Sequence, residues 1–188
     1  MKIRASVILI LVCLLVDDLI AYGLYPDPTF KGYGFISHLT FLALMFVLYD
    51  QPWKTRILSG LLCGLVSDFF FTDSFPLYAL IYPSLIYIAG LAKEWIKESA
   101  LKRFLWFLLL LILLDLIPYC TFAMMDPYQV PFGVWICHRG ILTWLINGLM
   151  ILLFQYIFDV MDRYYTIRRH RISAQEKKIY KRLRLSRK

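Results

Sequence analysis

Long apolar runs separated by short polar gaps dominate the hydrophobic pattern of the chain. A bilayer core of about 30 Å needs roughly 20 apolar residues in helical form, and helices are required because lipid cannot satisfy an exposed backbone. The pattern predicts six membrane-spanning helices, at residues 3–22, 34–49, 57–71, 75–92, 104–124 and 132–160. The third and fourth are short and almost contiguous, so they form either a tight helical hairpin or one broken, re-entrant segment. The sixth exceeds one bilayer thickness, so it should tilt or project beyond the membrane.

The positions of the basic residues predict the orientation of these helices. Of the 21 Lys and Arg residues, 11 lie at or after Arg163, and most of the others fall in alternate gaps between the apolar runs. Because loops rich in Lys and Arg stay in the cytoplasm, an even number of spans with both termini inside fits this distribution. The sequence therefore predicts an all-α, multi-pass helix bundle in the bacterial cytoplasmic (inner) membrane. Residues 1–162 form its transmembrane domain, and residues 163–188 form a basic cytoplasmic tail.

Composition agrees with lipid as the surrounding medium. The chain is 60% hydrophobic and 18% charged, whereas soluble domains are roughly 45–50% apolar. Its net charge of +8 is compatible with nucleic acid or an anionic membrane as partner. The sorting of the cations into gaps and a tail favours membrane topology over nucleic-acid binding.

The basic tail contains its own helix signal. Ser173 followed by Glu176 matches a capping box, which predicts a short helix with Ile179 and Leu183 on one face. Such a basic amphipathic helix would lie against anionic lipid. The alternative is a solvated tail that only fixes topology.

Charged groups inside the predicted spans need an explanation, because burying a charge in a membrane is costly. They are Asp17, Asp18, Asp68, Asp115 and Arg139, and all fall in the outer half of the bilayer in the predicted topology. At 1.5 Å of rise per residue, Asp115 and Arg139 reach a similar depth. We therefore expect a buried Asp115–Arg139 ion pair, with Asp17 or Asp18 as the alternative partner of the arginine.

Two polar stripes run along predicted helices at intervals of four residues. One contains Arg139, Thr143, Asn147 and Gln155, and the other contains Gly60, Gly64 and Asp68. Side chains four apart share one helix face, and small residues at this spacing allow close helix approach. Three readings stay open: internal packing, docking of helices from a partner, or a solvated cavity for a substrate or proton.

The sequence contains no HExxH, GxSxG or Gly-rich phosphate loop, which are signatures of catalytic and nucleotide-binding sites. The histidines and the four cysteines lack metal-binding spacing, so we predict no metal, no cofactor and no enzymatic activity. The cysteines all lie in apolar runs, where they act as small packing residues.

The stretch from Gly60 through Gly64 to Asp68, followed by an aromatic run, a short turn and an apolar helix, resembles the rod shape-determining protein MreD family. A late acidic residue in the first span and the chain length are also similar. One departure is Phe75-Pro76-Leu77-Tyr78, where the family often has a glycine after the turn.

The resemblance implies a structural role in cell elongation. Proteins of this family act with MreC, a RodA-type glycosyltransferase, a penicillin-binding protein and the actin-like MreB in peptidoglycan synthesis, as scaffolds and regulators. The family also looks like the substrate-binding membrane subunits of energy-coupling vitamin transporters, so a small-molecule transport subunit is the alternative. A membrane enzyme using paired aspartates is a weaker third hypothesis.

Overall fold

The structure is a computed structural model that describes the backbone of residues 3–23, 32–71, 76–125 and 130–186. Side chains are described for residues 5–23, 32–69, 76–125 and 130–168. The regular structure of these segments is helical, which confirms the predicted all-α membrane bundle. The helices are α1 (Ile3–Gly23), α2 (Leu39–Leu48), α3 (Trp53–Phe71), α4 (Tyr78–Leu91), α5 (Lys93–Lys97), α6 (Ala100–Met125), α7 (Phe132–Trp135), the π-helical turn η1 (Ile136–Gly140) and α8 (Ile141–Ser186).

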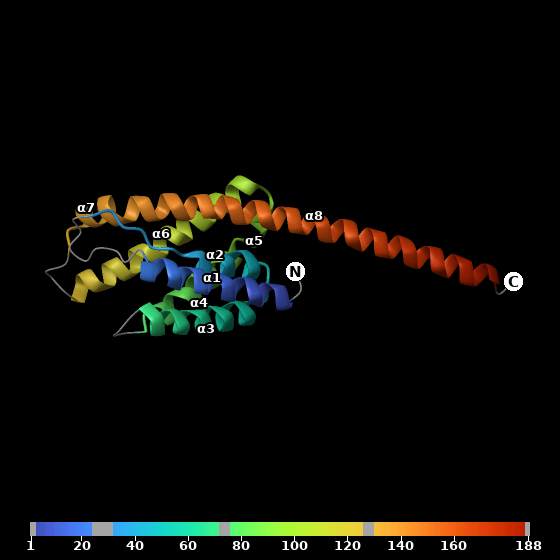
Figure 1. Ribbon diagram of the computed structural model, residues 1–188, viewed down its shortest axis with the longest axis horizontal. Coiled ribbons are helices and arrows are strands. Elements are labelled where there is room, and N and C mark those ends of the chain that lie inside the picture. Colours follow the sequence, from blue (N-terminus) through green and yellow to red (C-terminus); the bar gives the residue numbers. More distant parts are fainter. Residues whose placement is uncertain (1–2, 24–31, 72–75, 126–129, 187–188) are drawn as a thin grey trace.

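The six main helices run alternately up and down the bundle (Figure 1). Helices α1, α3 and α6 start at the end that carries most basic residues, which we call the basic end, and α2, α4 and α8 run back towards it. Helices α7 and η1 lie at the opposite, distal end. Helix α8 leaves the bundle at the basic end and projects far beyond it. The last helix is therefore longer than the bundle, and its projection beyond the membrane stays a prediction.

The helices differ in how much of each one can face lipid. Three stretches among the described residues are long and apolar enough to cross a membrane: Ala5–Gly23, Ala100–Met125 and Phe132–Arg168. Helix α1 exposes Val7, Leu11, Leu15 and Leu19 along its outer face, as expected for a helix in contact with lipid. These helices make the chain a membrane protein.

Helix α2 forms the centre of the bundle and is shorter than predicted. Its ten residues span only about 15 Å at 1.5 Å per residue, and residues 40–46 are all buried. Its core partners are Leu85 and Ile86 of α4 and Phe107 and Leu111 of α6, each at most 2% exposed. The predicted helix at residues 34–49 is therefore wrong in its first part, because residues 34–38 are not helical.

Helix α8 is longer than predicted, and no separate helix begins within it. It continues without a break through Ser173 to Ser186, so the new helix expected at the capping-box sequence does not form separately. Good helix formers on both sides of Ser173 allow the intrahelical hydrogen bonds of α8 to continue.

Candidate functional site

The carboxylate of Asp17 on α1 caps the buried end of α2. Its Oδ1 accepts hydrogen bonds from the Leu39 N–H at 3.0 Å and the Ser37 hydroxyl at 2.5 Å, and its Oδ2 accepts one from the Thr40 N–H at 2.7 Å. The first N–H groups of a helix have no intrahelical partner, and the helix dipole favours a negative charge there. A side chain from another helix thus supplies the cap that α2 lacks.

Asp68 on α3 does the same for α4. Its Oδ1 accepts a hydrogen bond from the Tyr78 N–H at 2.8 Å, and its Oδ2 accepts one from the Ala79 N–H at 2.6 Å. Helices α3 and α4 lie side by side and antiparallel (Figure 1). Of the two predicted arrangements for this region, the structure therefore shows the helical hairpin.

Gly60 and Gly64 let the two helices of this hairpin touch through their backbones. A Cβ atom at Gly60 would lie 2.8 Å from the Cα of Pro83, and one at Gly64 would lie 2.4 Å from the carbonyl oxygen of Tyr78. Such distances leave no room for a methyl group. The stripe that also contains Asp68 is thus occupied by α4 of the same chain, which favours internal packing over docking of a partner.

Asp115 on α6 joins α2 to α8. Its Oδ1 lies 2.7 Å from His38 Nε2, and its Oδ2 accepts a hydrogen bond at 2.9 Å from the indole N–H of Trp144. The Asp115 and His38 side chains are both buried. Each oxygen of Asp115 therefore has a partner other than the expected Arg139, and a direct Asp115–Arg139 ion pair stays a prediction.

The extended segment before α2 takes its hydrogen bonds from the polar stripe of α8. The Ile36 N–H donates to Thr143 Oγ1 at 3.1 Å, and the His38 N–H donates to Asn147 Oδ1 at 3.0 Å. The Asn147 amide in turn donates to the carbonyl of Ile36 at 2.8 Å. An extended backbone inside an apolar bundle requires such partners, and Thr143 and Asn147 are each only 1% exposed.

These contacts gather four of the predicted polar residues, Asp17, Asp115, Thr143 and Asn147, around the start of α2. We call this group the α2 polar cluster. It consists of Asp17, Ser37, His38, Asp115, Thr143, Trp144 and Asn147. Asp18 lies beside Asp17 but is only partly buried, and one of its oxygens is buried without a hydrogen-bond partner among the described residues. Sequence spacing did not separate the roles of these two aspartates.

A cavity of about 230 Å³ lies next to the cluster, towards the distal end. Arg139 and Asp115 line it together with the aromatic side chains of Tyr78, Tyr119 and Trp135. Arg139 belongs to η1, and π-helical turns occur frequently at functional positions. The cavity lies in the same half of the bundle as the charged groups of the predicted spans, and a role for it in binding a substrate or proton stays a prediction.

Comparison with known proteins identifies the family. The model of the family described as rod shape-determining protein MreD matches residues 2–164 of the 188-residue chain. The chain belongs to the MreD family. No curated protein and no solved structure matches it.

The match ends just where α8 leaves the bundle, so the MreD region coincides with the helix bundle itself. Within it, the sequence that resembles the family from Gly60 to Asp68 now has a structural explanation. Gly64 admits the backbone of α4, and Asp68, one helical turn later, caps that helix. MreD membership makes this a rod shape-determining protein.

Arg56 has a structural role that the sequence analysis missed. It lies in the gap before the third predicted span, where topology alone would explain a cation, but its side chain is 8% exposed, donates to the carbonyl of Tyr87 at 3.1 Å and lies over the Tyr87 ring at 5.6 Å. It passes directly over Gly90, where a Cβ would collide with the guanidinium. A glycine on the facing helix was the only available signal.

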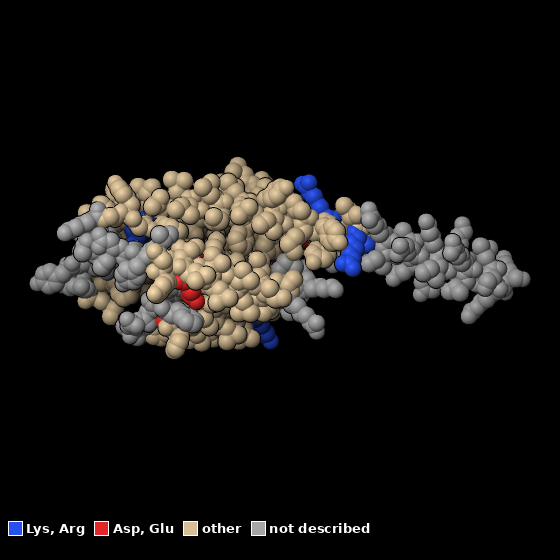
Figure 2. Space-filling view, in the orientation of Figure 1, with Lys and Arg blue, Asp and Glu red and all other residues tan. Residues whose placement is uncertain are grey.

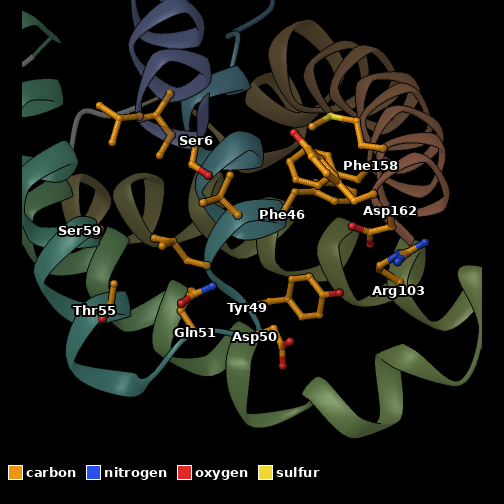
Figure 3. Close-up of a pocket in the computed structure, with 16 residues that line it drawn as sticks. Ser6, Phe46, Tyr49, Asp50, Gln51, Thr55, Ser59, Arg103, Phe158 and Asp162 are labelled. Carbon is orange, nitrogen blue, oxygen red and sulfur yellow. The ribbon is translucent and has the colours of Figure 1, made fainter. Parts of the chain in front are cut away.

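The basic end contains a larger groove, of about 440 Å³ (Figure 3). Ser6 of α1, Phe46 and Tyr49 at the end of α2, and Phe158 and Asp162 of α8 surround it. The groove is partly apolar and partly polar, and it separates the start of α1 from the part of α8 that leaves the bundle.

Charge is sorted between the two ends of the molecule. On the face shown in Figure 2, the bundle surface is largely uncharged, and most Lys and Arg side chains lie at the basic end and where α8 departs. Several are paired: Lys97 with Asp50 at 2.7 Å, and Arg103 with Asp159 at 2.8 Å. An apolar band with cations at one end is what the positive-inside rule expects of a membrane protein.

Proposed function

We propose that this protein is a non-enzymatic scaffold of the bacterial cell-elongation complex, which synthesises peptidoglycan, and that it acts with an MreC-like partner. The MreD family match over residues 2–164 carries the proposal. A RodA-type glycosyltransferase, a penicillin-binding protein and an MreB-like filament are the further expected members of the complex. We place the protein in the inner membrane as a multi-pass protein with its basic end in the cytoplasm.

The use of the polar side chains supports a scaffold role. The carboxylates of Asp17 and Asp68 accept hydrogen bonds from backbone N–H groups of the same chain, and the Asn147 amide donates one to a backbone carbonyl. These bonds fix the relative positions of α1, α2, α3, α4 and α8. Satisfied buried networks of this kind rigidify a fold. A rigid bundle with a lipid-facing exterior is suited to holding partner helices at fixed positions.

Depletion of the protein in a rod-shaped host tests this proposal. We expect cells to become round, and we expect wild-type protein purified in detergent to carry an MreC-like protein, identified by mass spectrometry. Depleted cells that stay rod-shaped, with no elongation protein in the purified material, would contradict the scaffold role.

The cavity beside Arg139 supports one alternative, a substrate-binding subunit of a vitamin-type transporter. It combines a cation, a carboxylate and aromatic rings in about 230 Å³, below the range of roughly 300–1,000 Å³ for most ligand sites. The same depletion experiment distinguishes the two functions: a vitamin requirement with unchanged shape would favour transport. In that case Arg139→Gln should abolish uptake.

A further inference from the structure

The buried face of α8 continues beyond the bundle. Inside the bundle this face consists of Thr143, Asn147, Ile151 and Phe154, none more than 7% exposed. At 3.6 residues per turn, the same face is next occupied by Phe158, Met161 and Tyr165, which line the groove at the basic end. Core-facing residues thus lead directly into an open groove.

The same face stays apolar along the projecting part of α8. Ile172, Ile179 and Leu183 follow Tyr165 at intervals of seven, seven and four residues, and the helix is continuous to Ser186. At about 100° per residue, the positions from Thr143 to Leu183 fall within a sector of about 80°. Such spacing is typical of a helix that packs against another helix.

The projecting segment also has a strong charge of one sign. Residues 163–188 contain 11 Lys and Arg residues and a single acidic residue, Glu176. Almost all of this segment lies outside the region that matches the MreD family, which ends at residue 164. The family match therefore does not explain why this segment combines an apolar face with so many cations.

We propose that the projecting part of α8 is a docking helix for an acidic amphipathic helix of a partner protein. The apolar face of that partner would cover Ile172, Ile179 and Leu183, and its end would enter the groove at Phe158, Met161 and Tyr165. Its Asp and Glu residues would complement the 11 cations, as charges beside the apolar seam do in coiled coils. Opposite charge also accelerates encounter and selects the partner.

The structure disfavours two other occupants of this surface. A helix lying on anionic lipid must turn into the membrane plane, whereas α8 continues from the bundle in one piece and points away from it (Figure 1). A second copy of the chain would bring two segments of 11 cations together, and like charges flanking a helix pair are destabilising.

Purified full-length protein in nanodiscs of phosphatidylcholine provides the test. The probe is a fluorescent four-heptad peptide with Leu at the a and d positions and Glu at e and g, and the matched probe has Lys at e and g. We expect only the acidic peptide to bind. The variant Ile172→Gln/Ile179→Gln/Leu183→Gln should weaken binding about tenfold or more, since each change removes a buried aliphatic group.

The control variant is Ile167→Gln/Leu185→Gln, which makes the same change on the opposite face of the helix. It should leave the affinity within about twofold of the unaltered protein. Equal affinity of both variants for the acidic peptide would overturn the proposal, because attraction would then be purely electrostatic.

Two further results would also overturn it. One is quenching of a fluorophore at position 179 by nitroxide-labelled lipid in phosphatidylglycerol nanodiscs, which would place the segment on the membrane. The other is dimerisation that the triple variant abolishes, which would identify a second copy as the occupant. Because the test uses purified protein, its failure would leave the proposed role in cell shape unaffected.

Discussion

At the scale of single residues, three buried carboxylates show how this bundle accommodates charge in apolar surroundings. Asp17 and Asp68 each accept backbone N–H groups at the start of another helix, and Asp115 contacts an imidazole and an indole N–H. Such donors offset the desolvation of a buried carboxylate. Backbone N–H groups and ring nitrogens thus hydrogen-bond to these three acidic groups.

Asp17 and Asp18 provide a matched pair for testing the cap. Asp17→Asn removes one of the two acceptor oxygens facing Ser37, Leu39 and Thr40, and should lower the free energy of unfolding by roughly 1–3 kcal/mol. Asp18→Asn should change it by less than about 0.5 kcal/mol, since none of the described hydrogen bonds is made by Asp18. Chemical unfolding of both variants in detergent measures the difference. Equal effects would show that the cap contributes no stability.

Gly64 and Gly148 provide a second matched pair of positions, which tests the close packing of helices. A Cβ at Gly64 meets the carbonyl oxygen of Tyr78 at 2.4 Å, whereas one at Gly148 meets only Leu108 Cδ1 at 3.7 Å. Gly64→Ala must therefore separate α3 from α4, at a cost of about 1–3 kcal/mol. Gly148→Ala should be neutral or slightly stabilising, because Ala is the better helix former. Melting temperatures in detergent check both, and an unchanged Gly64→Ala would refute the backbone contact.

The residue scale also shows where prediction from sequence ends. Spacing of four residues correctly placed Thr143 and Asn147 on a buried face, because helical periodicity is local. It did not identify Ser37, His38 or Trp144 as members of the α2 polar cluster. Their partners lie 20 to 109 residues away in the chain, so these contacts are determined by tertiary packing.

At the scale of elements, all six apolar runs contain a helix. The length of each helix depends on which backbone hydrogen bonds are available as well as on hydropathy. Residues 34–38 belong to the same predicted run as α2, yet they are not helical, and Thr143 and Asn147 satisfy the backbone N–H groups of Ile36 and His38. An apolar run alone cannot reveal such partners on a distant helix. The same limit applies to α8, whose continuity through Ser173 overrides the capping-box signal.

Replacing the polar stripe of α8 should release this extended segment. Asn147→Leu leaves the His38 N–H and the Ile36 carbonyl without partners, and should destabilise the protein by roughly 2–5 kcal/mol. Thr143→Val, which removes one acceptor and keeps the shape, should cost about 1–3 kcal/mol. Hydrogen–deuterium exchange of residues 34–40 should rise in the same order. Unchanged exchange in Asn147→Leu would mean that the segment does not depend on α8.

At the scale of the whole molecule, one arrangement is used twice. An acidic residue late in α1 caps α2, and an acidic residue late in α3 caps α4. Each pair thus joins a helix running away from the basic end to one running back towards it, and the cap lies in the distal half. Both caps thus lie in the distal half, whereas most Lys and Arg residues lie at the basic end or on the projecting part of α8.

The sorting of charge predicts the membrane orientation. Reporter fusions after Lys188 and after residue 97 should both be cytoplasmic, and fusions within residues 126–129 should be extracytoplasmic. A fusion after Lys188 that reports the extracytoplasmic side would invert the proposed placement of the basic end.

Removing residues 172–188 separates the bundle from its projecting helix. The described side chains of the core and of the groove end at Tyr165, so the truncated protein should keep the melting temperature of the full chain in detergent. Its yield of co-purified elongation proteins should fall, because the apolar stripe and most of the cations of the projecting segment are gone.

Internal deletion of a single residue such as Ala174 tests the same idea without removing the segment. This deletion rotates the apolar face beyond residue 174 by about 100° relative to the groove and leaves the charge unchanged. Binding that needs both the groove and this face should therefore weaken as in the truncation. Binding by charge alone should persist.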